Sequence, residues 1–286
     1  MILVKKFGDR RDGKKVRDIH GMQNILIDFK PNRCDSAVYM NRRIDMTEFV
    51  KFIKKKKEKI EGLTYYHGIV DIMAKTLYSR PFMNRFIAGR TMYMHNDVSL
   101  AATIKEQFED TSVEALMVIK VEPEDTLEDI SKKTKEKVNA IRQKQMSTKG
   151  NANGAADTLG KLPKFIRVPV VGLMKWMDKH DLLPKSLTED NLYYSSAILS
   201  NIGVFKVGAI YHNLTNFGTA SSLITFGEIV EENGKYYMEM GATIDERIAD
   251  GFYFCKVLKL IEYMFLNPEV MMRPAGEKVK YPEDKK

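Results

Sequence analysis

The sequence predicts an α/β protein in one domain that spans residues 1–286. Segments with apolar residues at helical spacing, such as residues 64–79, are interleaved with short apolar runs typical of strands, such as Ser221–Val230. Hydrophobic residues make up 44% of the chain and charged residues 29%, which is ordinary for a globular protein with a large core. Length alone allows one or two domains, but residues 146–160, rich in Gly, Ala, Asn and Ser, are interpreted as a surface loop rather than a domain boundary.

Apolar residues at helical spacing predict five helices, over residues 45–59, 64–79, 126–144, 162–180 and 251–266. Asp45 or Thr47 is expected to cap the first of these, which also has an acidic residue in its first turn. The segment 162–180 is apolar and basic and contains Trp176. Packing over the sheet is the favoured interpretation of that helix, and partner binding stays open as the alternative.

Strands are predicted over residues 24–29, 36–41, 86–88, 91–95, 99–104, 115–121, 195–200, 221–230 and 236–244. Gly89 is expected at the turn of a hairpin that ends at His95. Residues 1–27 form a basic N-terminal segment. Residues 273–286 form a charged tail that is expected to fray.

The formal net charge of +8 raises the question of an acidic partner. No basic motif interleaved with aromatic residues is present, so nucleic acid is not expected as a partner. No uninterrupted apolar stretch is long enough to span a bilayer, and no membrane partner is expected. Cys34 and Cys255 form neither a disulfide framework nor a metal-binding pattern, and the N-terminus lacks a signal peptide. We therefore expect a cytoplasmic protein without a metal cofactor.

Two short segments carry the candidate chemistry. The first is Leu199-Ser200-Asn201-Ile202-Gly203, and the second is Ile244-Asp245-Glu246-Arg247-Ile248-Ala249-Asp250-Gly251 at the start of an apolar helix. Taken alone, the first is an ordinary strand end, and the second is a helix N-terminus with acidic caps.

Together the two segments resemble motifs of the chloramphenicol acetyltransferase-like superfamily, which includes the catalytic domains of the dihydrolipoyl acyltransferases of 2-oxoacid dehydrogenase complexes. The preceding helices and hairpin follow in the order that this family uses. The resemblance covers roughly Asp28 to Glu269 and is poor over Ala140–Asp190. It implies a mixed-sheet sandwich with flanking helices that forms trimers.

The resemblance also implies roles for individual residues. Ser200 matches a hydroxyl that donates a hydrogen bond to the oxyanion of the tetrahedral intermediate. Asp250 and Gly251 match the end of the family's His-x-x-x-Asp-Gly motif, in which the aspartate holds an arginine. For that arginine the basic N-terminal segment offers three candidates: Arg10, Arg11 and Arg17. Glu246 occupies the position of the catalytic histidine, which is the general base of the family.

Glutamate changes the chemistry of that position. The ordinary pKa of a thiol is about 8.5, that of imidazole about 6.5 and that of a glutamate carboxyl about 4.3. Proton transfer from a thiol to a carboxylate is therefore about 3 kcal/mol more uphill than transfer to imidazole. Three outcomes stay open: Glu246 acts as the base of a modified acyl transfer, the domain binds coenzyme A without turnover, or another histidine substitutes. His212 is the best candidate for that substitution.

The function expected from these residues is acyl transfer between coenzyme A, or an acyl-coenzyme A, and a small thiol, amine or hydroxyl acceptor. The alternative is a catalytically inactive trimeric protein that binds coenzyme A or an acyl thioester. In either case the resemblance implies a homotrimer in which Ser200 and Glu246 of neighbouring subunits face each other. The sequence shows no lipoyl or subunit-binding module, which favours a stand-alone protein over the core of a dehydrogenase complex.

Overall fold

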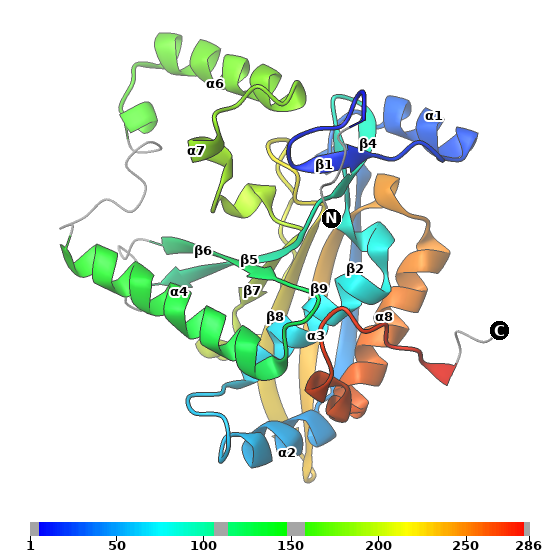
Figure 1. The fold of residues 1–286 in the computed structure, drawn as a ribbon, viewed down its shortest axis with the longest axis vertical. Helices are drawn as coiled ribbons and strands as arrows, with labels where there is room; N and C mark the ends of the chain where they lie inside the picture. Colours follow the sequence, from blue (N-terminus) through cyan, green and yellow to red (C-terminus); the bar gives the residue numbers. More distant parts are fainter. Residues whose placement is uncertain (1–5, 106–113, 148–157, 283–286) are drawn as a thin grey trace.

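A six-stranded mixed sheet forms the centre of the molecule (Figure 1). The computed structural model describes residues 6–105, 114–147 and 158–282. The strand order is β2-β9-β8-β7-β5-β6. The strands are β2 (Ala37–Asp45), β5 (Val98–Lys105), β6 (Glu114–Val121), β7 (Ala197–Asn201), β8 (Ser222–Glu232) and β9 (Lys235–Asp245). β7 runs parallel to β5 and β8, whereas the other neighbouring strands are antiparallel, so the sheet is mixed as the resemblance implies.

A smaller sheet of three strands lies beside the first, in the order β1-β4-β3. It consists of β1 (Gly13–Lys15), β3 (Arg85–Ala88) and β4 (Thr91–His95). Gly89 and Arg90 connect β3 to β4 and both have positive φ, 54° and 61°. Two residues with positive φ form the tight turn that suits the right-handed twist of a hairpin. The predicted hairpin with Gly89 at its turn is confirmed.

Four helices pack against one side of the large sheet or its edge (Figure 1): α2 (Thr47–Lys56), α3 (Tyr65–Ser79), α4 (Leu127–Ser147) and α8 (Gly251–Leu266). α3 is buried on all sides from His67 to Leu77, which explains its nearly continuous apolar sequence. The N-cap of α2 is Met46, whose side chain makes no capping hydrogen bond, so the prediction that Asp45 or Thr47 caps this helix is wrong. The Asp45 carboxylate, one residue before the cap, accepts a hydrogen bond from the Thr47 amide at 2.9 Å. These helices and the sheet enclose the main hydrophobic core.

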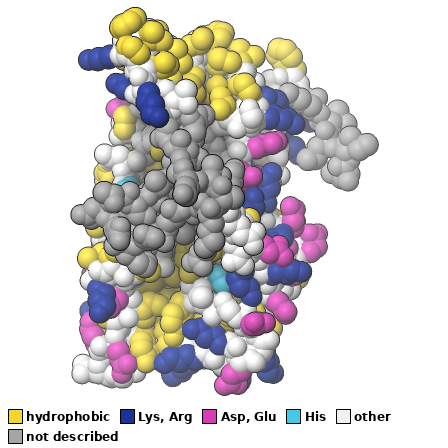
Figure 2. Space-filling view, turned by 90° about the vertical axis from the view of Figure 1, so that its left-hand side faces the viewer, with side chains coloured by type: hydrophobic (Ala, Val, Ile, Leu, Met, Phe, Trp, Pro, Cys, Tyr) yellow, Lys and Arg dark blue, Asp and Glu magenta, His cyan; other side chains and the backbone are white. Residues whose placement is uncertain are grey.

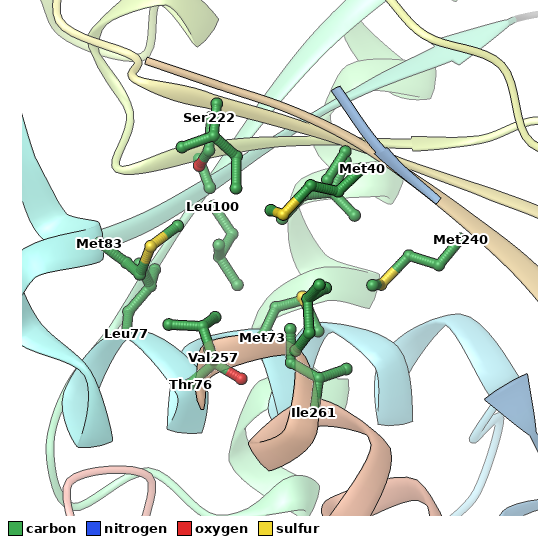
Figure 3. A pocket seen from close by; sticks show the side chains of 15 residues that line it. Met40, Met73, Thr76, Leu77, Met83, Leu100, Ser222, Met240, Val257 and Ile261 are labelled. Atoms are coloured by element: carbon green, nitrogen blue, oxygen red, sulfur yellow. The ribbon is translucent and has the colours of Figure 1, made fainter. Parts of the chain in front are cut away.

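The core between the sheet, α3 and α8 contains a cavity of about 30 Å³, roughly the space of one water molecule. Figure 3 shows the side chains around it, which include Met40, Met73, Met83 and Met240. Flexible methionine side chains fill irregular gaps between elements that do not interdigitate perfectly. The cavity is almost wholly apolar, and we interpret it as a packing defect of the core.

Three sequence-based expectations need correction. Residues 24–29 belong to helix α1 (Gly21–Phe29), although Ile25, Ile27 and Phe29 alternate as in a strand. Only Ile27 of α1 is buried, and it packs against the small sheet. Hydrogen bonds of Gln23 and Lys30 with Arg247 hold the helix in place. The tail does not fray at its start, because Ala275 and Tyr281 are buried and the Val279 amide donates to Ser79 Oγ. Within residues 146–160, the first two belong to α4, and residues 148–157 lie outside the described part of the chain.

Helix α6 (Lys164–Lys179) forms where residues 162–180 predicted a helix. Asp178 is its only buried residue, so α6 is not part of the core, and packing over the sheet is not what the structure shows. A short helix, α7 (Lys185–Thr188), follows it. No helix in the described ranges is both long and apolar enough to cross a membrane.

Gly218 and Gly234 allow a matched test of packing around this sheet. Both have positive φ, 79° and 78°, but a Cβ on Gly218 would lie 2.3 Å from the Tyr193 carbonyl oxygen, whereas one on Gly234 would meet nothing. Gly234→Ala should lower the free energy of unfolding by about 1 kcal/mol through backbone strain alone. Gly218→Ala should lower it by about 1–3 kcal/mol more, because the backbone must move. Urea denaturation measures both, and equal losses would contradict this account.

Two buried histidines should make stability depend on pH. Burial lowers the pKa of His67 and of His95 to about 4. As pH falls from about 6.5 to about 4, the unfolded chain binds protons that the folded chain excludes, so stability is lost across this window. Burial raises the pKa of Asp71 to about 7, so this carboxyl group adds stability as pH falls below about 7, which is opposite to the effect of the histidines. The histidine contribution is therefore measured as the difference between each variant and wild type.

The measurement is the free energy of unfolding across this pH window for His95→Gln, His67→Gln and the double variant. Each single variant should lose less unfolding free energy than wild type as pH falls, and the double variant should lose less than either single variant. The exposed His180 provides the control, and His180→Gln should follow the wild-type slope. If the His95→Gln slope matched that of wild type, the buried neutral imidazole would not be the cause.

Candidate functional site

Glu246 follows a strand end that is fixed by buried charge. β9 ends at Asp245, and residues Glu246–Ile248 form a single 3₁₀ turn. The Asp245 carboxylate is fully buried and accepts hydrogen bonds from Arg247 Nε at 2.8 Å, Arg247 Nη2 at 2.6 Å and Ser36 Oγ at 2.8 Å. Arg33 Nε lies 3.8 Å from the same carboxylate. A buried carboxylate with this many charged and polar donors fixes the backbone on both sides of it.

Arg33 connects this turn to a distant loop. Its guanidinium is buried and donates to the carbonyl oxygens of Thr215, Gly218 and Ile87 at 2.7, 2.8 and 3.2 Å. Burial lowers the pKa of Arg33, and the neighbouring Asp245 carboxylate partly offsets this effect. Residues that are remote in sequence therefore meet around one buried aspartate.

Glu246 itself projects from the turn and is partly exposed. Its carboxylate forms an ion pair with Lys30, the residue that follows α1. α1 is held here by two further contacts: Gln23 Nε2 donates to the Arg247 carbonyl at 2.9 Å, and Arg247 Nη1 donates to the Lys30 carbonyl at 2.8 Å. The backbone and one partner of Glu246 are thus fixed, and its carboxylate stays accessible from solvent, with 29% of the side chain exposed.

Asp250 has a different role from the one implied by the resemblance. It is exposed and forms the N-cap of α8, where its Oδ1 accepts a hydrogen bond from the Tyr253 amide at 2.7 Å. The interpretation of this segment as a capped helix start is therefore correct. The three arginines proposed as partners of Asp250 instead pair with other aspartates: Arg10 with Asp12, Arg11 with Asp181 and Arg17 with Asp9.

The expectation of an arginine from the basic N-terminal segment is thus wrong for Asp250 in the described chain. Within this motif it is Asp245, five residues earlier, that binds arginine, and its partners are Arg33 and Arg247. The physical reason is burial: Asp245 has no exposed surface and needs cationic partners, whereas Asp250 is hydrated and needs none.

Ser200 lies near the end of β7, on the sheet face opposite the helices. It lines a cavity of about 410 Å³ together with His212 and Asn213. The segment that carries His212 packs over β8 because two glycines, Gly203 and Gly227, meet there without side chains. Ser200 and the alternative histidine proposed from the sequence are therefore brought into one cavity.

A single chain does not bring Ser200 and Glu246 together. Ser200 pairs with Thr225 of β8, and Thr225 pairs with Gly241 of β9. Glu246 comes five residues after Gly241, which places it roughly 16 Å farther along the sheet and about two strand spacings away. Any reaction that uses both residues requires two chains.

Sequence reasoning missed Lys30, Arg33 and a second cavity beside Arg247. This cavity has a volume of about 560 Å³ and is strongly basic, with five cationic side chains in its lining: Arg33, Arg90, Lys175, Lys179 and Arg247. Arg247 was recognisable from its place next to Glu246, but no local pattern marks the other residues. Within the described part of the chain, no group of three or more His, Cys, Asp or Glu side chains is placed to hold a metal ion.

No protein-family model matches the sequence, and no curated protein matches it. Solved structures match the fold. A probable dihydrolipoamide acetyltransferase from Listeria monocytogenes is 17% identical, with a TM-score of 0.56 over 89% of this chain and 95% of the other. A chloramphenicol acetyltransferase is 10% identical, with a TM-score of 0.61 over 88% and 99%.

The dihydrolipoamide acetyltransferase of Azotobacter vinelandii is 13% identical, with a TM-score of 0.56 over 90% of this chain and 94% of the other. That structure was used to investigate the roles of a serine, a histidine and an asparagine in the catalytic mechanism. Identities this low establish the fold alone. The expected chloramphenicol acetyltransferase-like fold, a mixed sheet with flanking helices, is confirmed.

Asp245 and Asp250 provide a matched test of the two aspartate roles. Asp245→Asn leaves Arg33 and Arg247 buried without a counter-charge, and should lower the free energy of unfolding by about 3–5 kcal/mol. Asp250→Asn keeps a good helix cap and should change it by less than about 0.5 kcal/mol. Chemical denaturation monitored by circular dichroism measures both. A large loss for Asp250→Asn would show that this residue has a buried partner after all.

Proposed function

We propose that this protein transfers an acyl group between coenzyme A and a small thiol, amine or hydroxyl acceptor, and that it does so as a homotrimer. The fold shared with acetyltransferases supports the reaction class. The observation that carries the proposal is the position of Glu246: an accessible carboxylate on a turn fixed by buried ion pairs, where the resemblance places the family's base.

In the proposed reaction the acceptor X–H attacks the thioester carbonyl of the acyl-coenzyme A. The Glu246 carboxylate takes the proton of X–H as the new X–C bond forms. The hydroxyl of Ser200 from a neighbouring subunit donates a hydrogen bond to the oxyanion of the tetrahedral intermediate. The C–S bond then breaks, and Glu246 returns the proton to the departing thiolate, so that acyl–X and coenzyme A leave.

The surface around the Ser200 cavity supports the assembly. Three exposed apolar side chains of one segment line this cavity, Val204, Phe205 and Ile210, and the same segment exposes Val207 and Tyr211. A contiguous exposed apolar patch marks an interaction surface. In the proposed trimer, a second chain covers this surface and supplies the Glu246 that a single chain does not bring to its own Ser200.

The ion pair between Lys30 and Glu246 affects catalysis differently in the active enzyme and in the inactive alternative. As a positioning residue, Lys30 holds the carboxylate in one orientation. As a competing cation, it occupies a carboxylate oxygen that a base needs. The second case favours a protein that binds coenzyme A without turnover.

The test is coenzyme A release from acetyl-coenzyme A with a panel of thiols, amines and alcohols. Glu246→Gln should lower kcat about 10²-fold or more, because general-base catalysis contributes at least this much. Ser200→Ala should lower it about 10²-fold through loss of the oxyanion donor. Glu262→Gln is the matched control, since Glu262 also forms a partly exposed ion pair, with Arg42. Activity of Glu246→Gln equal to wild type would refute the base role.

Two further measurements separate the alternatives. If His212→Asn abolishes turnover and Glu246→Gln does not, His212 is the base. If wild type binds coenzyme A in calorimetry but releases none, and Glu246→His creates activity, the protein is the inactive binding form. Failure to bind coenzyme A at all would refute both the enzyme and the binding protein.

Sedimentation or light scattering tests the assembly. Wild type should have the mass of three chains. Val204→Asp introduces a charge into the apolar border of the Ser200 cavity and should shift the mass toward that of one chain. Met272→Asp changes an exposed apolar side chain elsewhere and should not. A wild-type mass of one chain would contradict a reaction that needs two.

A further inference from the structure

Helix α6 presents an apolar face to solvent. Phe165, Pro169, Leu173 and Trp176 are spaced by four, four and three residues, so they lie along one side of the helix. All four are exposed, and the fractions are 78% for Phe165, 57% for Leu173 and 52% for Trp176. Figure 2 shows hydrophobic side chains gathered at the end of the molecule where α6 lies, with Lys and Arg side chains beside them. We call these four residues the α6 ridge.

The ridge points outward because the opposite side of the helix is anchored. Asp178 is buried and accepts hydrogen bonds from the Tyr194 hydroxyl at 2.7 Å and the Gly218 amide at 2.9 Å. Its carbonyl oxygen accepts from Arg10 Nη1 at 2.8 Å. One end of α6 is therefore held against the body of the protein, and this fixes which side faces solvent.

The charge around the ridge is positive. Residues 161–185 contain six basic side chains: Lys161, Lys164, Arg167, Lys175, Lys179 and Lys185. The two acidic side chains of this segment, Asp178 and Asp181, both bind groups of the protein, Asp178 as described and Asp181 through Arg11. An apolar ridge with lysines alongside it complements a surface that is apolar inside and anionic outside.

Helix α1 presents a second apolar face at the same end of the molecule (Figure 1). Met22, Ile25 and Phe29 are exposed and spaced by three and four residues. The β3–β4 turn contacts both helices. Arg90 Nη1 lies 3.7 Å from Asp28 Oδ1 of α1, and the backbone of Gly89 packs against the carbonyl oxygen of Lys179 at the end of α6. Between the helices lies the basic cavity, and its lining includes Lys175, Lys179 and Arg90.

We propose that α6 and α1 dock this end of the protein onto a membrane surface that contains anionic phospholipid. The α6 ridge and the apolar face of α1 enter the headgroup region, and the lysines beside the ridge bind lipid phosphates. Tryptophan and phenylalanine are suited to this depth, because their rings are apolar and tolerate the interface. The protein lies on the membrane and does not cross it. The proposal differs from the sequence-based expectation of no membrane partner.

Charge favours a lipid surface over a second copy of the chain. Two copies that meet through the same face would place the lysines of one α6 beside those of the other, and like charges across an interface oppose association. An anionic bilayer supplies the missing negative charge and the apolar interior at the same time.

Trp176 makes the proposal directly measurable, because it is the only tryptophan of the chain. When it is excited selectively, its emission reports the polarity around the α6 ridge. We expect a blue shift, with quenching by brominated acyl chains, when vesicles of phosphatidylcholine mixed with phosphatidylglycerol are added. Vesicles of phosphatidylcholine alone should give neither, and high salt should reverse the shift.

Paired variants locate the contact. Lys175→Ala with Lys179→Ala should weaken partitioning into the mixed vesicles at least tenfold. Leu173→Ser should weaken it severalfold, since an apolar side chain is lost from the ridge. The matched control is Leu266→Ser, at an exposed leucine at the far end of α8, and its partitioning should equal that of wild type. Circular dichroism checks that each variant is folded.

Three results would overturn the proposal. One is the absence of any shift with the mixed vesicles. Another is equal binding to both vesicle types, because the lysines would then play no part. The third is a blue shift that grows with protein concentration without vesicles and accompanies a rise in mass, which identifies a second copy as the occupant. Glu246→Gln should bind vesicles like wild type, so failure of the acyl-transfer proposal is distinguishable from failure of this one.

Discussion

The buried Asp245 carboxylate, between the guanidinium groups of Arg33 and Arg247, is the interaction on which the candidate site depends. It lies at the end of a strand and is reached by segments from both ends of the chain. Buried charges are stable only when they are paired and hydrogen-bonded. Here the pairing determines where three separate segments can lie: the residues after α1, the 3₁₀ turn with Glu246, and the loop that ends at Gly218.

The sheet determines the second half of the site. β7 lies between β8 and β5, so Ser200, near its end, lies in the interior of the sheet rather than on an edge strand. The segment after β7 returns across the sheet because Gly203 and Gly227 permit close backbone contact. Glu246 belongs to the outer part of the same sheet. Ser200 and Glu246 of one chain therefore lie apart on the sheet, and the proposed chemistry follows only if chains associate.

The two motifs and the order of the helices predicted the fold through the family resemblance that they carry. The α/β class, the helices, the capped helix start and the glycine turn were predictable from local patterns alone. The position of Asp250 as a cap was also predictable from the residues that follow it. The pairing of Arg33 with Asp245 was not predictable, because more than 200 residues separate the two and no sequence spacing encodes such a contact. The assignment of α1 failed for a related reason. Its few apolar residues fit a strand as well as a helix, and contacts with the distant Arg247 decide between them.

Asp178 links the surface helix to the candidate site through two hydrogen bonds and one ion pair. Its carboxylate binds the Gly218 amide, the Gly218 carbonyl binds Arg33, and Arg33 pairs with Asp245 immediately before Glu246. α6 cannot tilt or slide at its anchored end without breaking the first of these bonds or moving the loop that holds Arg33. A displacement of α6 is therefore transmitted through three successive contacts to the backbone that positions the Glu246 carboxylate.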